Sequence, residues 1–151
     1  MCTILLRWDP AGDVAITLAA NRDEFRDRLA DDPDAIAPGV FAGRDRTAGG
    51  TWLAISRRGL AALTNVRAEA RDPHAPSRGA LPLAALASTL PGDLRPYNAF
   101  NLLVVDGDGA RVITHEGVGT AAVVSPLAPG AHVADNAPFG RLSPRARHAA
   151  A

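Results

Sequence analysis

The sequence predicts an α+β protein built mainly from antiparallel sheet, and three observations support this class. Short segments rich in apolar and β-branched residues occur in neighbouring pairs, separated by turn-forming residues. One Ala- and Leu-rich stretch, residues 78–90, has the composition of a long helix. This stretch lies between pairs of strands, an order that favours hairpins in an α+β fold.

The N-terminal part is expected to form a hairpin followed by a loop. Residues 2–8 (CTILLRW) and 14–20 (VAITLAA) have strand composition, and the intervening DPAGD has turn chemistry. Residues 25–38 are polar, rich in Asp and interrupted by Pro33 and Pro38. We therefore expect a long loop over residues 25–38.

The middle of the chain predicts a second hairpin and the helix. Residues 51–56 and 60–65 flank Arg57-Arg58-Gly59, where Gly59 can adopt a positive φ at little cost. Residues 68–77 are expected to be loop. The helix over 78–90 has Ser77 as a possible cap and Pro82 in its first turn. Residues 91–98 are expected to form a short second helical piece.

The C-terminal part predicts a third hairpin and two further strands. Residues 101–106 and 110–115 flank Gly107-Asp108-Gly109, and residues 121–125 and 131–135 have strand composition. Residues 141–151 are polar and then Ala-rich, so this tail is expected to fray. Residues 1–140 are therefore predicted to form a single domain.

Composition narrows the class of protein. A chain of 151 residues suits one domain that can bury a core without disulfides. A net charge of zero argues against binding nucleic acid or an anionic membrane. No run reaches the ~18 apolar residues of a membrane span, and the N-terminus lacks a signal peptide, so a cytoplasmic location is expected. The four histidines show no metal-ligand spacing, so no metal site is expected.

The only cysteine, Cys2, offers a specific chemistry because it follows Met1. Removal of Met1 before this small residue would leave Cys2 with both a thiol and a free α-amino group. Such an amine can act as general base for its own side chain. The alternative is structural, since a small apolar residue commonly begins a buried strand.

Several sequence blocks resemble one family, the NRDE family, also called the transport and Golgi organisation 2 family. They occur in the family's order after the initial Met-Cys. The blocks are NRDE at 21–24, GRD at 43–45, AGGTW at 48–52, LTNVR at 63–67, SRG at 77–79, YNAFNLL at 97–103 and HVADN at 132–136.

The wider resemblance is to cysteine N-terminal-nucleophile hydrolases of the bile-salt hydrolase and penicillin V acylase type. It implies a four-layer αββα sandwich in which Cys2 is the nucleophile and its own amine is the base. It further implies that Arg22 favours the thiolate and that Asp23 holds the amine. Asn65 would donate to the oxyanion, and Asn136 would be a second motif Asn.

The same resemblance implies a substrate pocket that includes Asn21, Glu24, Gly50 and Trp52. Each assignment has an alternative. Arg22 and Asp23 could pair with each other, Asn65 and Asn136 could be turn residues, and Glu24 could face solvent. Gly50 could belong to a flexible turn, and Trp52 could be core.

This chain is short for the family, which implies a shortened sandwich in which an uncovered sheet invites homodimerisation. The first functional hypothesis is hydrolysis of a small-molecule amide by Cys2, with no cofactor. The alternative is a binding or trafficking module for haem or a hydrophobic or lipid ligand, with Cys2 or a histidine touching the haem iron. A family member without either role is the third possibility.

Overall fold

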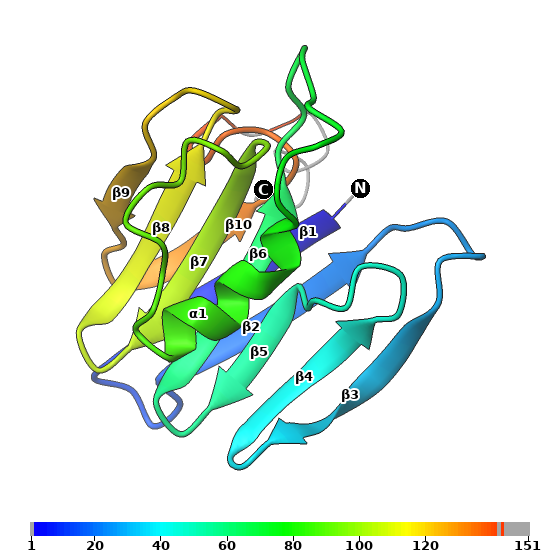
Figure 1. Ribbon diagram of the computed structural model, residues 1–151. Coiled ribbons are helices and arrows are strands. Elements are labelled where there is room, and N and C mark those ends of the chain that lie inside the picture. Colours follow the sequence, from blue (N-terminus) through cyan, green and yellow to red (C-terminus); the bar gives the residue numbers. More distant parts are fainter. Residues whose placement is uncertain (1, 142, 144–151) are drawn as a thin grey trace.

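The computed structural model describes residues 2–141 and residue 143, and it contains two antiparallel sheets (Figure 1). One sheet has seven strands in the order β3-β4-β5-β6-β7-β8-β9, and the other has three in the order β10-β1-β2. The elements are β1 (Cys2–Trp8), β2 (Ile16–Arg22), β3 (Ala30–Ala37), β4 (Val40–Asp45), β5 (Leu53–Ser56), β6 (Gly59–Asn65), η1 (Arg78–Ala80), α1 (Leu81–Leu86), β7 (Phe100–Asp106), β8 (Gly109–His115), β9 (Val123–Pro126) and β10 (Gly130–Ala134).

The seven-stranded sheet is the middle layer of the molecule. Figure 1 shows α1 lying across β5, β6 and β7, with β1, β2 and β10 on the opposite face. Strand β6 illustrates the division, since Ala61 and Leu63 pack toward α1 while Leu60 and Ala62 pack toward the three-stranded sheet. Because both faces are covered, β6 is a nearly continuous apolar run rather than an alternating one.

The expected α+β class with mostly antiparallel strands is confirmed. The strand over residues 2–8 has the predicted bounds, and the hairpins β5–β6 and β7–β8 form as predicted. Gly59 has a φ of 141°, and a Cβ there would lie 1.9 Å from the carbonyl oxygen of Val105. Strand β2 begins and ends two residues later than expected.

The loop predicted over residues 25–38 is wrong in its second half, because residues 30–37 form β3 and pair with β4. Strand β3 lies at the sheet edge, where proline is tolerated since one side of the strand needs no hydrogen-bond donor. Pro33 falls in a register shift between Asp31 and Asp34. Asp31 is half-buried, while Asp32 and Asp34 are exposed along this edge. Their polar composition is the reason that the sequence predicted a loop here.

The helix predicted over residues 78–90 is also shorter than expected. Residues 78–80 form a 3-10 turn, in which Ser77 Oγ accepts from Gly79 N as a cap, and α1 ends at Leu86. Ser88 has a φ of 57°, which breaks the helical path. Residues 91–98 form turns instead of the second helical piece.

The tail predicted to fray at 141–151 lies outside the described residues, apart from Arg141 and Ser143. The boundary of the domain at residue 140 stays a prediction. Within the described part of the chain, no helix has the length and apolar character needed to cross a membrane.

Candidate functional site

The two sheets bring Cys2 and the NRDE block to one end of the molecule. Cys2 begins β1 and pairs in register with Arg22 at the end of β2. A pocket of about 680 Å³ opens beside them. Its wall includes Cys2, Arg22, Glu24, Arg28, Asp45, Gly50, Trp52, Asn65, Arg78 and Asn98.

The nitrogen of Cys2 is held by a residue from the far end of the chain. It donates to Asn136 Oδ1 at 2.9 Å, and Asn136 Nδ2 donates in turn to the carbonyl oxygen of Asn65. Asn136 follows β10, the other neighbour of β1 in the small sheet. One side chain therefore ties the start of β1 to the end of β6.

The Cys2 thiol is half-buried, and burial raises its pKa above the ordinary value. The nearby Arg22 guanidinium and the main-chain N–H of Asp23 lower this pKa, whereas Glu24 raises it. Because burial is the larger influence, the resting side chain is a neutral thiol at neutral pH. Arg22 alone does not make it a thiolate, so a nucleophilic Cys2 would need a base.

The Arg22 guanidinium is fixed by groups on three sides. It donates to Asp45 Oδ2 at 2.8 Å, and Glu24 lies 3.8 Å away. Its central carbon lies 4.6 Å from the centre of the Trp52 ring, which is a cation–π contact. The Trp52 ring thus forms part of the pocket wall and contacts Arg22, and the Glu24 carboxylate approaches the same guanidinium.

Asp45 is the shared acceptor of this cluster. Arg28 Nε donates to it at 2.9 Å, and the main-chain N–H groups of Thr47 and Ala48 donate to its other oxygen. Burial would raise the pKa of Asp45, but the hydrogen bonds from Ala48, Arg28 and Thr47 outweigh it and lower that pKa. The carboxylate is therefore charged and already satisfied.

Gly50 has a packing role rather than one of flexibility. A Cβ at Gly50 would lie 2.6 Å from Gly79 Cα, so the two backbones meet at van der Waals contact. Thr51 N donates to the carbonyl oxygen of Gly79 at 2.8 Å. This contact joins the AGGTW and SRG blocks and forms part of the pocket wall.

The structure brings together most, but not all, of the residues predicted for the site. Cys2, Arg22, Asn65, Glu24, Gly50 and Trp52 line the pocket. Asn136 contacts the nitrogen of Cys2 from behind. Asp23 does not line the pocket, and its Oδ1 accepts from Asn21 Nδ2 at 2.5 Å. Their catalytic roles stay predictions.

A buried network behind the pocket was missed from the sequence. Asn101 Nδ2 donates to the carbonyl oxygens of Asp135 at 3.1 Å and Ala137 at 2.8 Å, and Thr64 Oγ1 donates to that of Asp135 at 2.7 Å. These bonds fix the main chain on both sides of Asn136. A polar residue at the start of the apolar run NLLVV was the signal that could have revealed Asn101.

A second group of site residues was also missed from the sequence. It consists of three further charged residues that line the pocket, Arg28, Asp45 and Arg78. Two of them lie within blocks quoted above, Asp45 in GRD and Arg78 in SRG, and Arg28 lies in the supposed loop. Among the described residues, no group of three or more His, Cys, Asp or Glu side chains has the geometry to hold a metal ion.

The fold and pocket define an α+β protein with two facing sheets and a pocket beside a cysteine at position 2. The sequence model of the family described as Transport and Golgi organisation 2 matches residues 1–150. The chain therefore belongs to the Transport and Golgi organisation 2 family.

Curated relatives agree with this membership. The Transport and Golgi organization 2 homolog of Mus musculus is 36% identical over 126 residues, covering 70% of this chain and 45% of that protein. The Bos taurus homolog is 35% identical over 158 residues, covering 91% of this chain and 57% of the relative. The Homo sapiens homolog is 37% identical over 133 residues, covering 74% and 47%. The chain spans about half the length of these relatives.

Proposed function

We propose that this chain is an amide hydrolase in which Cys2, after removal of Met1, attacks the carbonyl carbon of a small-molecule amide. The observation that carries the proposal is the position of two groups of Cys2, its main-chain nitrogen and its thiol side chain. Its nitrogen lies 2.9 Å from Asn136 Oδ1, while its side chain lines the pocket beside Arg22. Removal of Met1 would turn this nitrogen into an α-amino group held by the same acceptor.

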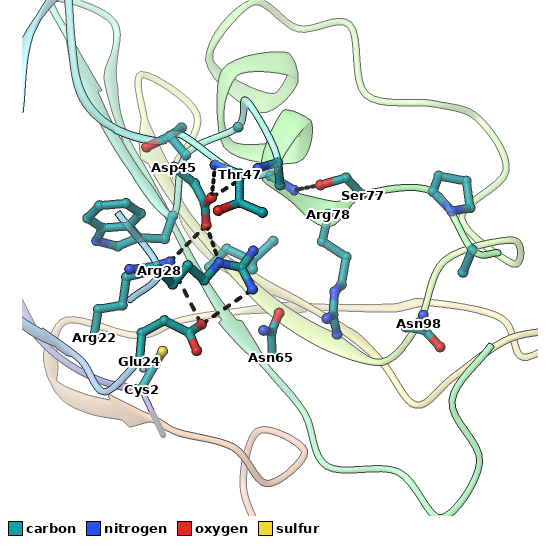
Figure 2. Close-up of a pocket in the computed structure, with 18 of the residues that line it drawn as sticks. Cys2, Arg22, Glu24, Arg28, Asp45, Thr47, Asn65, Ser77, Arg78 and Asn98 are labelled. Carbon is teal, nitrogen blue, oxygen red and sulfur yellow. Dashed lines mark hydrogen bonds and ion pairs between the residues drawn. The ribbon is translucent and has the colours of Figure 1, made fainter. Parts of the chain in front are cut away.

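The raised pKa of the Cys2 thiol fits a mechanism with an internal base. The free α-amino group, with an ordinary pKa near 8, takes the thiol proton as the sulfur adds to the carbonyl carbon. The resulting oxyanion needs a donor, and the pocket wall has the amide side chains of Asn65 and Asn98. Asn65 is the donor in this proposal, because the Asn98 side chain is already bonded to the main chain of Asp72. Figure 2 draws Asn65 between Cys2 and Arg78.

The tetrahedral intermediate then breaks its C–N bond. The leaving nitrogen takes the proton from the α-ammonium group, which leaves an acyl thioester on Cys2 and a neutral amine base. Water adds to the thioester with its proton passing to that amine, and the acid departs as the thiol is restored. We infer that the two facing sheets are the core of an N-terminal-nucleophile-like sandwich, with α1 as one helical layer.

The residues around the thiol have supporting roles in this proposal. Arg22, held by Asp45 and Trp52, offsets part of the cost of forming a thiolate in a buried place. Asp23 donates its main-chain N–H toward the thiol, and its predicted role in holding the α-amino group belongs to the same proposal.

The alternative function, binding of haem or of a hydrophobic or lipid ligand, would use the same pocket. Cys2 is the only cysteine or histidine that lines it within the described residues, so Cys2 would be the axial ligand of haem there. The charged groups Arg22, Glu24, Arg28 and Asp45 make this wall strongly polar, which favours a polar amide over a purely apolar ligand.

The test combines intact mass with single-turnover kinetics. We expect the purified protein to lack Met1 and to release a burst of amine from members of an amide panel. Cys2→Ala should abolish the burst. The sharper variant inserts Arg between Met1 and Cys2, which keeps the thiol but prevents a free amine at Cys2.

Two results would contradict the hydrolase. One is full retention of Met1 in the native protein. The other is an undiminished burst from the Arg-insertion protein, since the thiol would then need no α-amino base. A Soret band that appears on haem titration and is lost in Cys2→Ala, together with no burst on any amide, would favour the binding function.

A further inference from the structure

Arg78 lies on the opposite side of the pocket from Cys2 and is held on a rigid wall. Figure 2 shows its side chain pointing between Asn65 and Asn98. The main chain beside it is fixed, because Gly79 packs against Gly50 and accepts from Thr51 N at 2.8 Å. The Arg78 guanidinium is therefore presented to the pocket from a fixed position.

The guanidinium of Arg78 has few partners for a partly buried cation. Its Nη1 donates to the carbonyl oxygen of Ala99 at 2.6 Å, and within the described residues this is its only hydrogen bond. A guanidinium carries five N–H donors, so most of those of Arg78 have no acceptor in the part of the chain that the structure describes. The pocket carboxylates, Glu24, Asp27, Asp45 and Asp72, form no ion pair with Arg78.

The contrast with the arginines near Cys2 is clear. Arg22 and Arg28 share Asp45 and approach Glu24, so their charges are balanced by the protein. Arg78 has no such balance, and burial lowers its pKa to about 10, with Arg71 and Arg28 adding repulsion. At neutral pH it remains a cation that forms no ion pair with any of the described carboxylates.

A partly buried and unpaired cation is costly unless another charge meets it. A carboxylate or phosphate fits the fork of a guanidinium with two parallel hydrogen bonds. We propose that Arg78 binds an oxyanion of the pocket's ligand, a carboxylate or a phosphate, at a point separate from the group that faces Cys2. Combined with the proposed hydrolase function, on which this step rests, the Arg78 site makes the substrate an amide that also carries an acidic group.

The experiment observes Arg78 directly. The ¹⁵N–¹H resonance of Arg78 Nε, assigned from its absence in Arg78→Lys, is followed by NMR at constant ionic strength. The probes are benzoate, phenyl phosphate and the neutral benzamide. We expect a saturable shift with at least one of the two anions and none with benzamide. The anion that binds more tightly identifies carboxylate or phosphate as the group recognised.

A matched pair of variants separates Arg78 from general positive charge. Arg71 also lines the pocket but is exposed. Arg78→Gln should weaken binding of the preferred anion about tenfold or more, the loss expected for one charge-assisted contact. Arg71→Gln should weaken it by less than about threefold, as for a screened surface charge. The idea is wrong if neither anion shifts Arg78 saturably, if benzamide binds equally well, or if the two variants lose the same affinity.

The outcome is independent of catalysis because the titration is repeated in Cys2→Ala. Anion binding that persists there, in a protein that shows no amide burst, would leave the Arg78 site standing while the hydrolase fails. A burst that is equally fast on neutral amides and on their carboxylate analogues would leave the hydrolase standing while the acidic substrate fails.

Discussion

Asn101 and His115 lie one register position apart in the same pair of strands, and neither side chain is exposed. Asn101 Nδ2 donates to three oxygens and its Oδ1 accepts from Thr114 Oγ1 and Phe139 N. Neither ring nitrogen of His115 has a hydrogen bond of ordinary geometry to the residues that the structure describes. Its ring instead stacks on Phe100, with centroids 5.3 Å apart.

The difference follows from the face of the sheet that each residue occupies. Asn101 shares the face of Leu103 and Val105, which packs toward the three-stranded sheet and the site. His115 shares the face of Phe100, which packs on the side of α1. Burial alone therefore does not identify a polar residue that serves the site. The hydrogen bonds do, because those of Asn101 lead through residues 135–137 to the nitrogen of Cys2.

The largest effect is expected for Asn101→Leu. The substitution keeps the branched shape of the side chain but strands the carbonyl of Ala137 and the N–H of Phe139, and it leaves the Asp135 carbonyl with Thr64 Oγ1 alone. We expect the free energy of unfolding to fall by about 3–5 kcal/mol, measured by urea denaturation. Thr114→Val, which removes one bond to the same side chain, should cost only about 1 kcal/mol. Equal losses in the two variants would show that the other hydrogen bonds of Asn101 add nothing to stability.

Local patterns predicted the strands well where pairing is between neighbours, as in β5–β6 and β7–β8. They failed at β3, because an exposed edge strand needs no apolar alternation and its Asp residues resemble a loop. They also failed at the end of α1, where Ser88 takes a φ of 57° and the main-chain N–H groups of Ser88 and Thr89 close the helix on Ala85 O and Ala84 O.

The candidate site was predictable only in part, for a related reason. The Met-Cys start and the NRDE block pointed to Cys2 and Arg22, which the register of β1 and β2 places opposite each other. The partners of Arg22 come from Asp45 and Trp52, which are distant in sequence and belong to another sheet and its loop. No local spacing encodes a contact of that kind.

A smaller but more specific effect is expected for Asn136→Ala. On the proposed mechanism this variant loses the acceptor that orients the Cys2 nitrogen, so amide hydrolysis should slow about a hundredfold. The free energy of unfolding should fall by only about 1–2 kcal/mol, since Asn101 still holds the main chain on either side.

Asn136→Asp is the matched control for that variant. It keeps an oxygen for the Cys2 nitrogen but loses the Nδ2 donor to the carbonyl of Asn65. Because Asn136→Asp keeps the acceptor for the Cys2 nitrogen, it should retain more activity than Asn136→Ala, even though both variants lose the Nδ2 donor. Activity that follows stability in both variants would instead make Asn136 a purely structural residue.

The smallest effect concerns His115 and appears only as a dependence on pH. Burial lowers the pKa of His115, and a main-chain interaction with Thr120 opposes part of that change. As the pH falls below the unfolded value near 6.5, the unfolded chain takes up a proton that the folded protein resists. The free energy of unfolding should therefore decline by up to about 1.4 kcal/mol per pH unit, down to the folded pKa, and be independent of this group above that window.

His115→Phe should remove this slope between about pH 6.5 and pH 5, a range above the titration of most carboxylates. It should also raise stability at neutral pH by about 1 kcal/mol, because two unsatisfied nitrogens leave the core while the stacking on Phe100 is kept. The control is His74→Gln, an exposed histidine that should leave the slope unchanged. A slope that survives in His115→Phe would mean that the buried ring finds a partner when protonated, and the contrast with Asn101 would then be one of degree.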